Sequence, residues 1–302
     1  MDIFITGAAG YIGGTVAARS IAAGHRVRGL VRTAQKAGLL VQRGIDPVVG
    51  DLDDAEVLVR EARRADGVVH AASADHADAV AALIEALAGS GKPLVHTSGS
   101  SVIGDDARGN RASEQVFDED SAFVVAPAKQ ARRELELSVL HAAERGVRSA
   151  VICPSHIYGT GRGLNPHSVQ IPFLVSNARQ HGAVQIVGAG LNRWSNVHID
   201  DVAELYLLAL TRAPAGAFYF VENGEASFGE IGAAIAARLG LRVESLPAET
   251  AAQQWGEGRA LYTFGSNSRV RARRARRELG WMPRHSSAIA WIEQEMPLPV
   301  MP

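Results

Sequence analysis

Three glycines near the N-terminus have the spacing of a phosphate-binding loop. Gly7, Gly10 and Gly13 lie between an apolar strand predicted over residues 2–6 and a helix predicted over residues 10–23. Glycines at this spacing allow a tight turn and bring the backbone close to a pyrophosphate, which the free N–H groups at the start of the helix bind. We therefore expect a dinucleotide here. The residues expected to contact it are Gly7, Ala9, Gly10, Tyr11, Ile12 and Gly13.

The end of the second predicted strand indicates which dinucleotide fits. This strand covers residues 26–31 and is followed by Arg32 and Thr33, without a carboxylate. An NAD site usually has an acidic side chain at this point, which accepts hydrogen bonds from the ribose 2′-hydroxyl. A guanidinium can instead hold a 2′-phosphate through a charge-assisted, forked contact. Arg32 thus favours NADP(H), while NAD(H), with Arg32 as an ordinary surface residue, stays open.

Short apolar runs alternate with helical stretches through the first half of the chain. This alternation predicts an α/β fold, a doubly wound parallel sheet of Rossmann type that binds its ligand at the carboxyl ends of the strands. The predicted strands cover residues 2–6, 26–31, 46–49, 67–70, 94–97 and 148–153. The predicted helices cover residues 10–23, 33–43, 54–64, 75–88 and 128–144.

The second half has a less regular pattern, and we expect it to form a smaller, mainly helical lobe. Helices are expected over residues 169–181, from a cap at Asp200 to about 212, over 228–239 and over 286–296. The chain is therefore divided into a dinucleotide-binding domain, residues 1–158, and a mainly substrate-binding lobe, residues 159–302. Segments around 184–222 are expected to return to the sheet of the first domain.

Composition and charge exclude several classes of partner. The 302 residues carry a net charge of −1 and are 47% hydrophobic, which predicts a globular protein that binds neither nucleic acid nor membrane. The single cysteine, Cys153, and an N-terminus without a leader pattern suit the cytoplasm. The ten histidines lack metal-ligand spacing, so no metal is expected.

Several later motifs give the chain a family resemblance. Asp51-Leu52, His70-Ala71-Ala72-Ser73 and the stretch from Pro154 to Gly159 each follow a predicted strand. With the stretches 197–203 and 278–283, they make the chain similar to the extended short-chain dehydrogenase/reductase family, the NAD-dependent epimerase/dehydratase group. The resemblance implies an NAD(P)-dependent enzyme. The further cofactor contacts that it implies are Asp51, Leu52, Ala71, Ala72, Ser73 and Pro154.

The catalytic residues depart from the pattern of this family. Its members usually carry Tyr-x-x-x-Lys on the helix after the fifth strand, where the lysine holds the nicotinamide ribose and lowers the pKa of the tyrosine. Lys129 matches the lysine, but Val125 stands at the tyrosine position. Gly99 likewise replaces the serine or threonine of the family. Its neighbours Ser98, Ser100 and Ser101 could supply a hydroxyl, and we expect Ser98 or Ser100 to polarise the substrate.

The missing tyrosine leaves both the proton donor and the function open. Tyr158 is the candidate donor, with His156 beside it. We expect an NADP(H)-dependent oxidoreductase that reduces a small carbonyl or related unsaturated substrate. One alternative is a nucleotide-sugar epimerase or dehydratase with retained NAD, although those reactions begin by oxidising a hydroxyl and so need the tyrosine. The other is a non-catalytic NADP(H)-binding redox sensor.

Polar side chains of the second half are candidates for substrate contact. Arg193 and Trp194 combine a cation with an indole, which can bind a polar or aromatic substrate, although Trp194 also fits a plain core role. His156 and His198 are further candidates, and His198 also fits a packing or capping role. A run of six arginines between residues 269 and 277 predicts a solvated helix face.

The resemblance also implies a homodimer. In the family, two helices from each subunit usually form a four-helix bundle. The predicted helices 75–88 and 128–144 have Ala- and Leu-rich faces that permit this arrangement. A small-molecule substrate and a second copy of the chain are therefore the expected partners.

Overall fold

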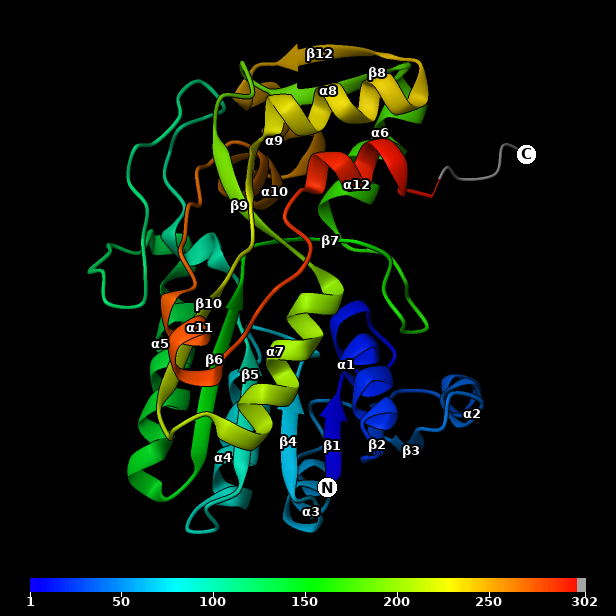
Figure 1. The fold of residues 1–302 in the computed structure, drawn as a ribbon, viewed down its shortest axis with the longest axis vertical. Helices are drawn as coiled ribbons and strands as arrows, with labels where there is room; N and C mark the ends of the chain where they lie inside the picture. Colours follow the sequence, from blue (N-terminus) through cyan, green and yellow to red (C-terminus); the bar gives the residue numbers. More distant parts are fainter. Residues whose placement is uncertain (298–302) are drawn as a thin grey trace.

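A seven-stranded parallel sheet forms the lower half of the molecule in the computed structural model, which describes residues 1–297 (Figure 1). The strand order is β10-β6-β5-β4-β1-β2-β3, so the chain winds from β1 to one edge and then to the other. This order confirms the predicted doubly wound α/β fold. The strands are β1 (Asp2–Thr6), β2 (Arg26–Val31), β3 (Asp46–Val49), β4 (Gly67–His70), β5 (Pro93–Thr97), β6 (Arg148–Pro154) and β10 (Ala217–Val221).

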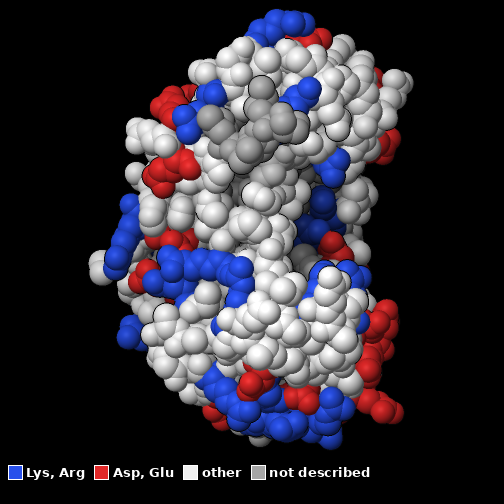
Figure 2. Space-filling view, turned by 90° about the vertical axis from the view of Figure 1, so that its right-hand side faces the viewer, with Lys and Arg blue, Asp and Glu red and all other residues white. Residues whose placement is uncertain are grey.

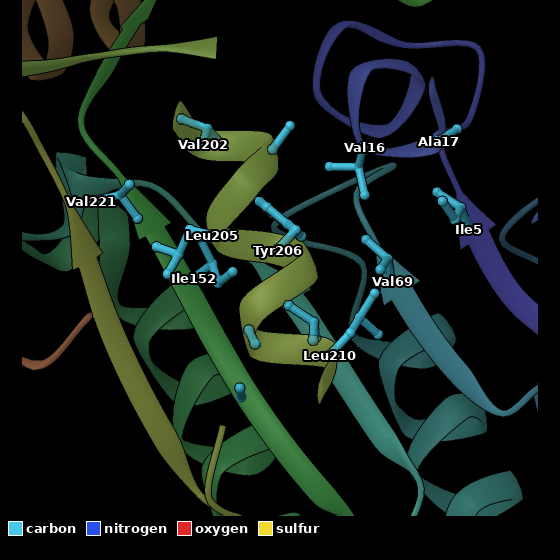
Figure 3. Close-up of a cluster of buried hydrophobic side chains, with 14 of the residues drawn as sticks. Ile5, Val16, Ala17, Val69, Ile152, Val202, Leu205, Tyr206, Leu210 and Val221 are labelled. Atoms are coloured by element: carbon cyan, nitrogen blue, oxygen red, sulfur yellow. The ribbon is translucent and has the colours of Figure 1, made fainter. Parts of the chain in front are cut away.

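Helices cover both faces of this sheet because its strands are apolar on both sides. On one face, Leu205, Tyr206 and Leu210 of α7 lie over Val69 and Ile152 of the sheet (Figure 3). The helices contributing to this core are α1 (Tyr11–Ala22), α2 (Ala34–Val41), α7 (Ile199–Arg212) and α11 (Arg273–Leu279). Those of the opposite core are α3 (Ala55–Arg64), α4 (Ala77–Leu87) and α5 (Gln130–His141).

An upper lobe with its own core stands above the carboxyl ends of these strands (Figure 1). It contains two small sheets, β11-β9-β7 and β12-β8, packed with helices. Its strands are β7 (His156–Tyr158), β8 (Ala183–Val187), β9 (Arg193–His198), β11 (Glu225–Ser227) and β12 (Arg242–Leu246). Its helices are α6 (Gln170–His181), α8 (Phe228–Leu239), α9 (Ala248–Trp255), α10 (Glu257–Arg259) and α12 (Ala288–Gln294).

The segment around residues 184–222 differs from the prediction in two details, namely the sheet that its strands join and the residue that caps α7. Of the segment around 184–222, α7 and β10 return to the seven-stranded sheet, whereas β8 and β9 pair within the upper lobe. The expected cap at Asp200 is wrong, because His198 is the N-cap of α7 and its Nδ1 accepts the N–H of Asp200 at 3.2 Å. The Asp200 carboxylate instead pairs with Arg162 at 3.0 Å.

The arginine run between residues 269 and 277 is paired with carboxylates, most of them from distant parts of the chain. Arg269 and Arg271 pair with Glu225, and Arg276 pairs with Glu222. The remaining pairs are Arg273–Asp118, Arg274–Asp120 and, with the adjacent residue, Arg277–Glu278. These pairs connect the 118–120 loop and the β10–β11 connection to α11. Arg273, Arg276 and Arg277 are nevertheless exposed, which agrees with the predicted solvated helix face.

Charge is also intermixed on the face drawn in Figure 2, where basic and acidic side chains lie among one another. Within residues 1–297, no helix combines the length and the apolar character that crossing a bilayer requires. In the same part of the chain, no three His, Cys, Asp or Glu side chains come together as a metal site.

Candidate functional site

The glycine loop between β1 and α1 has no room for side chains. Gly7 adopts a φ of +77°, and a Cβ on it would lie 2.7 Å from the carbonyl oxygen of Ala71. A Cβ on Gly13 would overlap the backbone of Gly7. Because the N-cap of α1, Gly10, provides no side-chain cap, the first N–H groups of this helix are free to bind an anion.

A cavity of about 550 Å³ opens beside this loop, and we call it the loop cavity. It brings together eight residues predicted to contact the cofactor, namely Gly7, Ala9, Gly10, Arg32, Asp51, Leu52, Ala71 and Ala72. The predicted contact Ser73 does not line it. The sequence analysis missed Lys36, His76 and Asn165, which also line it. Lys36 follows Arg32 by four residues at the start of α2, a spacing that could have identified it.

Two cations thus face the loop cavity at the end of β2. Both Arg32 and Lys36 are exposed, and neither side chain makes a hydrogen bond or ion pair with residues 1–297. Unpaired cations of this kind can bind a phosphate without first giving up a carboxylate partner.

A second cavity, of about 310 Å³, lies on the other side of the glycine loop and is called the lysine cavity. Gly10 lines the loop cavity while the next residue, Tyr11, lines the lysine cavity, so the two adjoin. The lysine cavity collects seven predicted site residues, namely Tyr11, Ile12, Ser98, Ser100, Lys129, Pro154 and Trp194. Gly99 and Ser101, which the sequence analysis considered at the position of the family's hydroxyl, also line it. Residues that the sequence analysis missed are Arg132, Ser155, Ile157, Ser168, Val169, Gln170 and Thr263.

Lys129 is the free cation of this cavity. Its side chain makes no ion pair with the described residues, whereas neighbouring Arg132 forms two hydrogen bonds with Asp75, at 2.7 and 2.6 Å. Burial, and then the positive charge of Arg132, lower the pKa of Lys129. The Nζ of Lys129 lies 5.8 Å from the ring centroid of Tyr262 in the upper lobe.

The serine hydroxyls of the lysine cavity are already engaged. Ser98 donates to the buried carboxylate of Glu136, and Ser100 Oγ accepts from Ser268 Oγ at 2.8 Å. Ser101 Oγ accepts from Arg132 at 3.1 Å. Ser268 Oγ also donates to the carbonyl of Ser100 at 2.8 Å, and together these contacts fix the hydroxyls in place.

Four of the predicted site residues do not reach the lysine cavity. Ile157 of β7 lines the cavity, and because side chains alternate along a strand, His156 and Tyr158 point into the upper lobe. Tyr158 is 1% exposed, with its ring against His198 and Trp291. The expectation that it donates the proton therefore lacks a geometric basis.

Arg193 and His198, the other two predicted site residues that do not reach the lysine cavity, make structural contacts within the upper lobe. Arg193 pairs with Glu225 and Glu230, at 3.5 and 3.4 Å. His198 caps α7 and stacks on His285 with ring centroids 3.9 Å apart, which is the packing and capping role weighed for it. Trp194 is 4% exposed and donates its Nε1–H to the carbonyl of Ser266. It therefore lines the lysine cavity with its indole held in one orientation.

A third cavity, of about 480 Å³, continues from the lysine cavity and is called the apolar cavity. Ser100–Ile103 contributes to the walls of both, as do the stretches 126–129 and 263–269. The apolar side chains lining it are Ile103, Phe117, Ala122, Phe123, Val124 and Ala126. The charged lining residues are already paired, Asp105 with Asn267 and Arg269 with Glu225.

His156 makes the stability of the protein depend on pH. Its two nitrogens have no hydrogen-bond partner among residues 1–297, its ring stacks on Phe228, and burial lowers its pKa to about 4. Between pH 6.5 and 4 the unfolded chain binds the extra proton, so the free energy of unfolding falls as the pH falls through this window.

Replacement of His156 by Phe should remove this dependence. Between pH 7.5 and 4.5, urea unfolding should show wild type losing roughly 2 kcal/mol more stability than His156→Phe. If wild type and His156→Phe lost the same free energy of unfolding between these pH values, His156 would not be a buried neutral base.

Comparisons with known proteins identify the family. The model of the NAD dependent epimerase/dehydratase family matches residues 3–219. The chain is 35% identical to the protein named oxidase ucsJ of Acremonium sp over 93% of this chain and 92% of that one. It is 28% identical to the 4-hydroxy-2-methyl-3-oxo-4-farnesyl-3,4-dihydroquinoline-1-oxide ketoreductase of Stigmatella aurantiaca, over 74% of this chain and 69% of that one.

A solved structure supports the fold. The dTDP-glucose 4,6-dehydratase of Bacillus anthracis in complex with NAD superimposes with a TM-score of 0.74 at 19% identity, covering 98% of this chain and 97% of that one. The glycine loop, the free Lys129 and the family match agree with one another. The chain therefore belongs to the NAD-dependent epimerase/dehydratase family of extended short-chain dehydrogenase/reductases, and it is an NAD(P)-dependent enzyme of oxidoreductase type.

Proposed function

We propose that this protein is an NADP(H)-dependent reductase of a small carbonyl compound that has an apolar part. The observation that carries the proposal is the position of Lys129, an unpaired cation, in a cavity that adjoins the glycine loop. A dinucleotide held by this loop would extend from the loop cavity toward Lys129. The nicotinamide then supplies the hydride, and the protein has to orient it against the carbonyl carbon.

The residues present fit such a cofactor. The free N–H groups at the start of α1 would bind the pyrophosphate, since the glycines leave no Cβ in the way. Arg32 and Lys36 would bind the 2′-phosphate, and Asp51 with Leu52 would contact the adenine. Lys129 would hold the nicotinamide ribose.

The charged residues that line the lysine and apolar cavities favour an apolar carbonyl compound over a nucleotide sugar as the substrate. A diphosphate needs cations or free N–H groups to bind it. The cations lining the lysine and apolar cavities are Lys129, Arg132 and Arg269, and the two arginines are paired with Asp75 and Glu225. The name of the Stigmatella relative, a ketoreductase acting on a farnesyl-substituted ring, supports the same substrate chemistry.

The cofactor preference is tested by titrating NADPH and NADH while following the change in protein fluorescence. NADPH should bind at least tenfold more tightly, because a tenfold ratio needs only about 1.4 kcal/mol, which one arginine–phosphate contact provides. Arg32→Ala should remove this preference by weakening NADPH alone, and Lys36→Ala should reduce it.

A matched control lies nearby in the chain. Arg43 donates to the carbonyl of Arg162 at 2.6 Å and does not line the loop cavity, so Arg43→Ala should keep the preference for NADPH. Equal affinities of wild type for NADPH and NADH would contradict the role assigned to Arg32.

The reductase activity is tested with NADPH and a panel of aryl and alkyl ketones, aldehydes and enones. Wild type should oxidise NADPH with at least one of them. Lys129→Met should lower kcat/KM by about 100-fold, since a preorganised charge at the reacting end contributes on this scale. Lys92→Met removes a lysine that only contacts the carbonyl of Arg63, and it should leave the rate unchanged.

Two outcomes would overturn the proposal. Binding of NADPH without turnover of any carbonyl compound would favour a redox sensor. Tightly retained NAD(H) after purification, with turnover of a nucleotide sugar and no net cofactor consumption, would favour an epimerase or dehydratase.

A further inference from the structure

A carbonyl reductase needs a proton for the oxygen of its substrate, and Val125 cannot supply one. The chain has five tyrosines. Tyr11 donates to the carbonyl of Gly159 at 2.8 Å, and the hydroxyls of Tyr206 and Tyr219 contact Thr97 and Glu278. With Tyr158 buried in the upper lobe, one tyrosine is left for the site.

That tyrosine, Tyr262, lies beside the lysine that the missing phenol would have contacted. The Nζ of Lys129 is 5.8 Å from the ring centroid of Tyr262. Tyr262 is half-buried, and its hydroxyl makes no hydrogen bond within residues 1–297. The next residue, Thr263, lines the lysine cavity, so Tyr262 lies directly beside this cavity, with the Nζ of Lys129 over its ring.

The backbone that carries Tyr262 has an uncommon conformation. Ala260–Phe264 forms a π-helical turn directly after α10. Such turns are rare and occur frequently at functional sites. This one is held firmly, because Asn192 Nδ2 donates to the carbonyls of Phe264 and Ser266, at 2.9 and 2.7 Å, and Phe264 packs against Trp255. The position of the phenol is therefore set by the core of the upper lobe.

We propose that Tyr262 is the proton donor of the reaction, supplied by the upper lobe in place of the tyrosine that position 125 lacks. This role rests on the proposed reductase function. A reduced nicotinamide would supply the hydride for the new C–H bond, and the π electrons of the carbonyl would move to its oxygen. This oxygen would take the proton from Tyr262 Oη, giving the alcohol. The phenolate that remains would lie near the ammonium of Lys129 and regain its proton from water.

The other groups near the lysine cavity are less suited to this role. Ser98 and Ser101 have their hydroxyls engaged with Glu136 and Arg132, and a serine is a weaker acid than a phenol. Ser100 Oγ is engaged with Ser268 Oγ at 2.8 Å. His156 is buried in the upper lobe, where its ring stacks on Phe228.

The first experiment compares Tyr262→Phe with Tyr158→Phe in the holoenzyme. Tyr262→Phe keeps the ring beside Lys129 and removes only the hydroxyl, so the fold and the Kd for NADPH should stay as in wild type. Its kcat should fall at least 100-fold, the usual contribution of a general acid. Tyr158→Phe should keep kcat within a few-fold. Unchanged kcat in Tyr262→Phe would overturn the proposal.

The second experiment needs neither substrate nor cofactor. An aryl sulfonyl fluoride reacts with a phenol whose anion is stabilised by a neighbouring cation, and peptide mapping by mass spectrometry locates the product. Tyr262 should be the principal tyrosine labelled, and Lys129→Met should lower its labelling at least fivefold. Lys92→Met should not change it.

The two experiments separate this proposal from the proposed function. Absent labelling of Tyr262, or labelling that is equal in Lys129→Met, would overturn the pairing of Tyr262 with Lys129 even in an active reductase. Labelling that depends on Lys129 in a protein that reduces no carbonyl would sustain the pairing and overturn the reductase function.

Discussion

The site depends on direct backbone contact between two segments that meet at glycines. The loop from Gly7 to Gly14 meets the stretch 161–163, where a Cβ on Gly14 would overlap Gly163 and a Cβ on Gly163 would overlap Gly10. Hydrogen bonds from Arg162 N–H to Thr15 Oγ1, at 2.9 Å, and from Tyr11 Oη to the carbonyl of Gly159 fasten this contact. The segment that leaves the large sheet is therefore held against the dinucleotide loop, and the upper lobe stands where it can close the lysine cavity.

The chemistry of the site is divided between the two halves of the molecule. The large sheet and its helices provide the glycine loop, the cations after β2 and Lys129. The upper lobe provides Trp194, Thr263 and Tyr262. Arg269 links the two halves, because its guanidinium binds Glu225 of β11 and also donates to the carbonyl of Ser113 in the long loop after β5. With these arginines paired internally, a substrate would meet the apolar side chains of the apolar cavity and the mainly polar lining of the lysine cavity. In that lining, Lys129 is a cation without an ion-pair partner in residues 1–297.

The sequence predicted what depends on local pattern and missed what depends on distant contacts. The bounds of β1 to β4 agree with prediction to the residue, because buried parallel strands are short apolar runs between clear breaks. Tyr158 and His156 were misplaced because β7 leaves the large sheet and alternation turns both toward the upper lobe. The sequence predicted that the arginine run is solvated but not that it is paired, because partners such as Glu225 and Asp120 lie 44 and 154 positions away in the chain. Tyr262 has no local signature, since only the fold brings it to Lys129.

The π-helical turn at Ala260–Phe264 fixes the angular position of Tyr262. One residue more or less in a helix rotates every side chain beyond it by about 100° around the axis. Loss of one residue between α10 and Tyr262 would therefore rotate this side chain away from Lys129. The length of this short turn, and not only the identity of residue 262, decides whether a phenol lies beside the ammonium.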